Sequence, residues 1–145
     1  ERTGIIWWNV RDGWPIISDA VVDYYGSKKL AYYFLQNVQK NVCLLINDPV
    51  DGAYPLVAVN DTRLPAEGTV ATGKEVFKGS YNVGPNGRQC VSNLPVMKGQ
   101  GMLQIRYDAN GESCSNHFLY GEPPYKLKEY KGWLDKTKMY TNKDK

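Results

Sequence analysis

From residue 41 onward, apolar and polar residues alternate along short segments, a period of two that is typical of strands with one buried face. The alternation is clearest at Leu103, Ile105 and Tyr107, which stand between Gln104 and Arg106. Seven such segments are predicted as strands: residues 41–47, 56–60, 69–72, 76–83, 89–94, 101–107 and 113–120. Turn residues separate them, and residues 108–111 should join the last two strands as a hairpin. The pattern predicts a mainly β fold, an immunoglobulin-like antiparallel β-sandwich over residues 40–125.

A period of 3.6 residues replaces the alternation at two places. Over residues 28–39, apolar side chains recur at helical spacing, and Ser27 is a suitable N-cap for a helix there. After Pro123 and Pro124, which end the predicted sandwich, residues 125–138 predict a short helix with Leu127, Tyr130 and Leu134 on one side and Trp133 beside them. Residues 126–145 thus form a short helix and a basic tail, of which residues 139–145 are expected to be disordered.

The beginning of the chain has a third pattern. Residues 4–10 are almost wholly apolar and rich in β-branched and aromatic residues, as in a strand that is buried on both faces. Charge, a glycine, a tryptophan and a proline follow at residues 11–15. In a parallel α/β barrel the chemistry lies at this carboxyl end of the strands. The sequence therefore predicts a strand, loop and helix of a (β/α)8 barrel over residues 1–39.

Three tryptophans within eight residues are difficult to cover in an ordinary core, because each indole needs roughly 150–250 Å² of covering surface and a partner for its N–H. A sugar ring can supply part of that cover. Trp8, Asp12 and Trp14, with Asn9 between them, are therefore candidate substrate-binding residues. Periodicity favours a core position for Trp7 and leaves Trp8 open between core and sugar subsite.

These residues carry a resemblance to a known family. The matching order is Trp8, residues 12–15, Ser18, residues 23–26, Lys28 and residues 31–33. It resembles the segment that closes the catalytic barrel in glycoside hydrolase family two, especially in the β-mannosidase-like branch. Arg11 departs from the pattern, because many members have Asn there.

The resemblance implies that the chain is the C-terminal accessory region of an exo-acting glycosidase. It also implies that both catalytic carboxylates are glutamates on earlier barrel strands, so that no catalytic residue is expected in this chain. Asp12 would then bind a sugar hydroxyl and would be neither the acid nor the nucleophile. The implied partners are an upstream barrel of the same polypeptide and a saccharide.

Length and composition limit the other possibilities. With 145 residues the chain suffices for one modest domain but not for a barrel of about 250 residues, so we expect a soluble fragment of a longer protein. It shows no signal peptide and no apolar run of membrane-spanning length. From residue 126 onward seven lysines face three acidic residues, an excess expected to be solvated and not to bind nucleic acid.

Cysteine and histidine content argues against a metal site or cofactor. Cys43, Cys90 and Cys114 show no Cys-x-x-Cys spacing, and His117 is the one histidine of the sequence. A zinc site needs about four ligands of these types. Small thiols on strands are the simpler interpretation.

Two other hypotheses assign residues 40–125 to a different class of protein domain. Residues 40–125 could form a stand-alone carbohydrate-binding module, or a structural domain that braces the barrel. Without a barrel, the strand at residues 4–10 would dock on its own chain or, preferably, pair with the same strand of a second copy to form a homodimer.

Overall fold

The computed structural model describes residues 6–73 and 76–137. These residues divide into two compact units, residues 6–38 and residues 39–137, and each is described by itself. The predicted disorder of residues 139–145 concerns residues outside the described ranges. Among the described residues, no helix has the length and apolar character needed to cross a membrane.

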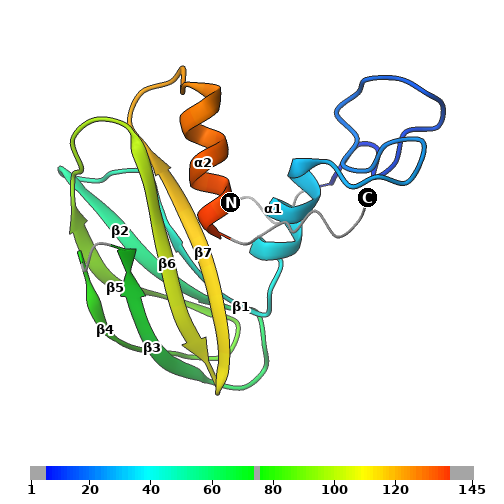
Figure 1. Ribbon diagram of the computed structural model, residues 1–145. Helices are drawn as coiled ribbons and strands as arrows, with labels where there is room; N and C mark the ends of the chain where they lie inside the picture. Colours follow the sequence, from blue (N-terminus) through cyan, green and yellow to red (C-terminus); the bar gives the residue numbers. More distant parts are fainter. Residues whose placement is uncertain (1–5, 74–75, 138–145) are drawn as a thin grey trace. The chain divides into compact units, whose positions relative to one another are not determined.

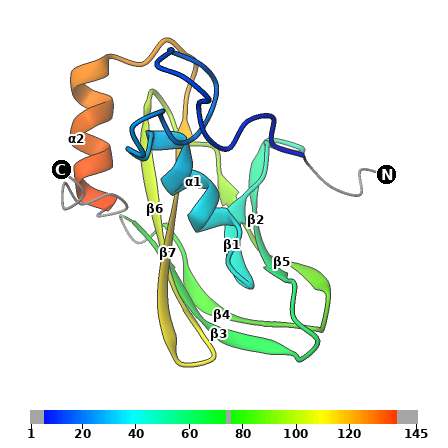
Figure 2. The same ribbon diagram turned by 90° about the vertical axis from the view of Figure 1, so that its right-hand side faces the viewer.

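The larger unit contains the seven predicted strands (Figures 1 and 2). Their bounds are β1 Val42–Ile46, β2 Ala53–Asn60, β3 Ala66–Thr72, β4 Lys78–Val83, β5 Gly87–Pro95, β6 Gly101–Ala109 and β7 Glu112–Tyr120. All the paired strands are antiparallel. They form a three-stranded sheet of order β1-β2-β5 and a four-stranded sheet of order β4-β3-β6-β7. The predicted immunoglobulin-like β-sandwich is confirmed.

The last hairpin forms as predicted. β6 and β7 are paired along their whole length, with Gly101 opposite Tyr120 and Ala109 opposite Glu112. The two residues between them, Asn110 and Gly111, both have a positive φ, at 51° and 90°. That is the combination a two-residue type I′ turn requires, and its twist matches the twist of the strands.

The core lies between the two sheets and consists of alternate residues of the strands. Leu44, Leu56, Leu94 and Ile105 are almost completely removed from solvent. Each such side chain contributes about 1.5–3 kcal/mol relative to its exposed state. Tyr107 also points inward and donates a hydrogen bond across the sandwich to the carbonyl of Val42, at 3.2 Å.

A polar residue, Asn60, is also fully buried at the end of β2. Its Nδ2 donates to the carbonyls of Leu64 and Gly84, at 2.8 and 3.0 Å. Its Oδ1 accepts from the backbone N–H and the hydroxyl of Thr62, at 3.0 and 2.7 Å. One side chain thereby ties the β2–β3 loop to the end of β4.

The helix α2, Leu127–Thr137, confirms the second predicted helix and packs against β6 and β7 (Figure 1). Leu134 is only 2% exposed, yet it is not part of the cluster between the sheets. It is therefore buried on the outer side of the four-stranded sheet. Leu127, predicted on the same side of the helix, is 65% exposed.

The smaller unit contains the helix α1, Leu30–Val38, which confirms the predicted helix but begins later than expected. Ser27 is not its N-cap, because the helix begins at Leu30 and Lys29 directly precedes it.

The predicted strand at residues 4–10 is wrong for its described part, residues 6–10, which form no strand. Asn9 has a φ of 63°, a left-handed conformation that a regular strand does not contain. A buried strand also needs neighbours on both sides to satisfy its backbone groups. Among the described residues, Val22 pairs with this end of the segment, through a hydrogen bond to the carbonyl of Val10 and a bridge to Arg11.

Replacing Asn60 by Asp tests the role of this buried amide. The substitution removes the donor and turns a carboxylate oxygen toward two carbonyl groups, so we expect a loss of at least about 2 kcal/mol in the free energy of unfolding. Urea denaturation followed by tryptophan fluorescence measures it. The matched control is Asn47→Asp at an exposed position, which should change stability by less than about 0.5 kcal/mol. Equal effects of the two substitutions would contradict a structural role for the Asn60 amide.

Candidate functional site

Asp12, a predicted sugar-binding residue, lies inside the smaller unit with only 2% of its side chain exposed. The Ser18 hydroxyl donates to its Oδ1. Lys29 Nζ lies 3.0 Å from its Oδ2 and also donates to the carbonyl of Ser18, at 3.0 Å. We call Asp12, Ser18 and Lys29 the Asp12 cluster. Both carboxylate oxygens thus have a partner within the unit.

Backbone hydrogen bonds hold the segments around the Asp12 cluster. Val22 N–H donates to the carbonyl of Val10 at 2.9 Å, and Asp12 N–H donates to the carbonyl of Val22 at 3.0 Å. Lys29 N–H donates to the carbonyl of Val21 at 2.9 Å. Ala20 and Val21, between these segments, are buried. Three short segments, residues 10–12, 21–22 and 29, are therefore fixed to one another.

The charge state of Asp12 follows from these contacts. The hydrogen bond from Ser18 and the hydrogen bond from Lys29 both lower the pKa of the Asp12 carboxyl, and they outweigh the opposing effect of burial. Asp12 is consequently ionised at neutral pH and is unsuited to act as a general acid.

The tryptophans that precede and follow Asp12 are exposed. Trp8 is 80% and Trp14 is 65% exposed, so both rings are open to a ligand or to another part of a protein. Trp14 lies in the loop of residues 13–17, which the contact between Asp12 and Ser18 closes. The expectation that Trp7 belongs to the core is wrong in this structure, where it is 47% exposed. Because residues 6–10 form no strand, alternate side chains face no second layer.

Sequence reasoning missed Lys29. The resemblance points to its neighbour Lys28, whose ammonium lies 5.0 Å from the ring centre of Tyr32. Lys29 reaches Asp12 across 17 positions, and no local pattern indicates such a pairing. The only available signal is a lysine directly before an apolar helix, which does not specify a partner.

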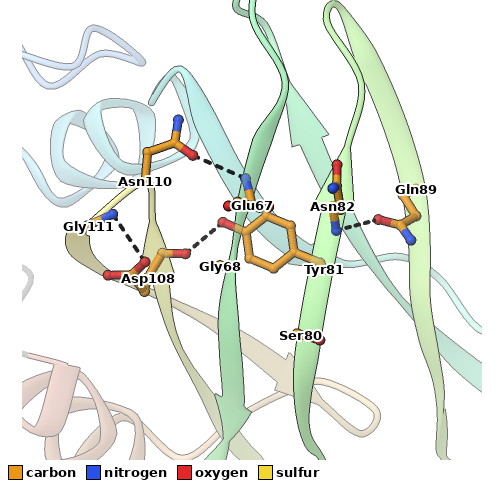
Figure 3. A pocket seen from close by; sticks show the side chains of 9 residues that line it. All are labelled: Glu67, Gly68, Ser80, Tyr81, Asn82, Gln89, Asp108, Asn110 and Gly111. Atoms are coloured by element: carbon orange, nitrogen blue, oxygen red, sulfur yellow. Dashed lines mark hydrogen bonds between the residues drawn. The ribbon is translucent and has the colours of Figure 1, made fainter.

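A second site, in the sandwich, is a polar pocket of about 780 Å³ at one end of β3 and β4 (Figure 3). Its buried Tyr81 donates a hydrogen bond to the carbonyl of Asp108 at 2.7 Å. Burial and the nearby Asp108 carboxylate raise the pKa of Tyr81 to about 12, so the hydroxyl remains a donor at neutral pH. Sequence reasoning did not predict this pocket, because its residues come from β3, β4, β5 and the β6–β7 hairpin.

The described glutamates lie on different elements of the larger unit. Glu67 lies on β3, Glu112 on β7, Glu122 after β7 and Glu129 on α2. Glu1 and Glu75 lie outside the described ranges. In residues 6–73 and 76–137, no group of three or more His, Cys, Asp and Glu residues is arranged to hold a metal ion.

The three cysteines are free thiols, with Cys43 buried, Cys114 half-buried and Cys90 exposed. Burial raises the pKa of the Cys43 thiol and lowers the pKa of His117. Both groups are therefore held in their neutral forms, as expected for structural positions on strands.

Comparison with known proteins places the chain beside glycoside hydrolases. No protein-family model matches the chain. It is 29% identical over 107 residues to β-mannosidase B of Aspergillus niger, an alignment that covers 58% of this chain and 13% of the relative. The chain thus spans about an eighth of the length of the curated relative it matches. This match confirms the resemblance to a fragment of a β-mannosidase-like enzyme.

Solved structures support the fold. A β-D-mannosidase from Dictyoglomus thermophilum superposes with a TM-score of 0.64 at 18% identity, covering 77% of this chain and 15% of that one. The exo-chitosanase of Amycolatopsis orientalis superposes with a TM-score of 0.62 at 19% identity, covering 84% of this chain and 16% of that one.

The Asp12 cluster predicts a pH dependence. Because its contacts lower the pKa of Asp12, their stabilising effect is present above the ordinary carboxyl pKa and is lost as the pH falls through the lowered one. Titration of the Asp12 carboxyl carbon by NMR should give a midpoint below the ordinary range. In Lys29→Met and in Ser18→Ala the midpoint should rise.

Lys28→Met is the matched control for this titration, because Lys28 lies over Tyr32 and should leave the Asp12 midpoint unchanged. An ordinary midpoint in the unmodified chain would show that the Asp12 cluster does not form in solution.

Proposed function

We propose that this chain is the C-terminal region of an exo-acting glycoside hydrolase, in which residues 1–39 complete the catalytic barrel and the sandwich is an accessory domain. The similarity to glycoside hydrolases that supports this proposal is the match to β-mannosidase B.

The observation that carries the proposal is the exposed apolar surface of the smaller unit. Ile6, Trp8, Val10, Trp14 and Ile17 are all more than 60% exposed. Single exposed apolar residues are normal, but so many within twelve positions indicate a surface that another part of a protein covers. A parallel barrel offers apolar neighbours of the kind that these residues need.

In the parent enzyme, the indole rings of Trp8 and Trp14 would contact the substrate. Trp8 and Trp14 are open, and a sugar ring packs well on an aromatic face. Asp12 sits between them in sequence, with its carboxylate held in the Asp12 cluster, and we propose that it contributes to the subsite from that fixed position. Catalysis would require the two carboxylates of the upstream barrel.

The isolated chain should hydrolyse no aryl glycoside. We propose that the pair of carboxylates about 5–5.5 Å apart, which a retaining mechanism needs, belongs to the upstream barrel, so that only binding effects remain in this chain. Release of nitrophenol from nitrophenyl β-mannoside, β-galactoside and β-glucosaminide measures this, with the full-length enzyme as the positive control. Turnover by the pure chain that falls on Glu67→Gln or Glu112→Gln substitution would contradict the proposal.

In the full-length enzyme, Trp8→Ala should lower kcat/KM by about tenfold or more with little loss of stability. A ring that covers the sugar contributes about 1.5 kcal/mol or more to transition-state binding. Trp7→Ala is the matched comparison and should instead cost about 3–5 kcal/mol of stability, because the barrel would cover this indole. Normal kinetics for Trp8→Ala together with an equal loss of stability would assign both indoles to packing.

A further inference from the structure

The polar pocket of the sandwich combines side chains from separate strands around Tyr81 (Figure 3). Asp108 and Asn110 of the β6–β7 hairpin lie on one side of Tyr81, and Asn82 and Gln89 lie on the other. Gly68 of β3 allows the hairpin to approach, because a Cβ at this position would overlap the carbonyl of Asp108. The volume of about 780 Å³ falls within the range of small-molecule sites, about 300–1,000 Å³.

Three of these side chains are anchored at one polar atom only. Asp108 Oδ1 accepts from the backbone N–H of Gly111, at 3.1 Å. Gln89 Oε1 accepts from the N–H of Asn82, and Asn110 Oδ1 accepts from the N–H of Glu67, each at 3.1 Å. Each contact fixes the orientation of a side chain while its second polar atom remains available. The second polar atoms of these side chains are an acceptor, Asp108 Oδ2, and two donors, Asn110 Nδ2 and Gln89 Nε2.

Further polar groups complete the array. Glu67, Ser80 and Asn82 line the same pocket, and the described part of the chain gives their side chains no hydrogen-bond partner. They add a carboxylate acceptor, a hydroxyl and an amide that can both donate and accept. Each of these three residues is exposed, so its polar group is accessible to a ligand.

The chemistry of the array selects a class of ligand. The lining offers both donors and acceptors, which suits vicinal hydroxyls, because each hydroxyl donates one hydrogen bond and accepts others. The described lining includes two carboxylates and neither Lys nor Arg, which disfavours sugar phosphates and uronic acids. The lining also offers no exposed ring for stacking, since Tyr81 is only 3% exposed. Binding would then rest on hydrogen bonds and have a dissociation constant in the millimolar range.

We propose that this pocket is a non-catalytic binding site for a neutral mono- or disaccharide, separate from the subsite that Trp8 and Trp14 would form. The site lies wholly within residues 67–111 of the sandwich. It does not depend on the proposed barrel, so a failure of either proposal leaves the other intact.

Titration of the isotope-labelled chain with neutral sugars, followed by amide NMR shifts, tests the site directly. Mannose, mannobiose and glucose are added up to about 100 mM, with glucuronic acid and mannose 6-phosphate as anionic comparisons. We expect saturable shifts at the amides of Glu67, Asn82, Gln89 and Gly111 for a neutral sugar, and at least tenfold weaker binding of the anionic ones.

Paired variants locate the binding. Ser80→Ala/Asn82→Ala removes two side-chain groups that form no hydrogen bond within the described residues, and it should weaken binding at least fivefold. Ser115→Ala/Asn93→Ala removes the same chemical groups elsewhere on the sandwich and should leave the dissociation constant unchanged.

Three results would overturn the proposal: no saturable shift with any neutral sugar, tighter binding of the anionic sugars, or shifts centred outside the pocket. Because the unmodified chain alone supplies each of these results, the test does not depend on correct folding of the variants.

Discussion

Burial of one face of each sheet against the other is the constraint on which the larger unit depends. Leu44 and Leu56 from the three-stranded sheet meet the inward residues of the four-stranded sheet, such as Ile105, in one continuous cluster. The same requirement decides where polar groups are tolerated. Asn60 can lie in this interior only because its amide satisfies backbone groups of two loops that have no strand partner.

The smaller unit is held by a different kind of interaction. It lacks a second layer, and its described apolar residues are largely exposed, so polar contacts determine its local conformation. Asp12, Ser18 and Lys29 fix three segments that would otherwise have only a few backbone hydrogen bonds. An ion pair of this kind specifies geometry more than it adds stability. Such a fixed geometry fits our proposal that another part of the parent protein covers the apolar surface of this segment.

The sequence predicts those features that have a local cause. Alternation at Leu103, Ile105 and Tyr107 predicts a strand because successive side chains point to opposite faces, and Asn110 with Gly111 predicts a turn because both tolerate a positive φ. The prediction of a strand at residues 6–10 is wrong because a buried strand needs neighbouring strands. An apolar pattern in the sequence does not show whether those neighbours are present. Lys29 and the polar pocket escaped prediction because each depends on residues brought together from distant positions by the topology.

The Asp12 cluster has a consequence for how this segment can evolve. A lysine lost at position 29 leaves a buried carboxylate without its counter-charge, and an asparagine at position 12 leaves the ammonium of Lys29 with weaker acceptors. Three uncharged residues at positions 12, 18 and 29 could also satisfy one another, but only if the substitutions occur together. Among homologous sequences, positions 12, 18 and 29 should therefore covary, whereas Lys28 should vary independently of them.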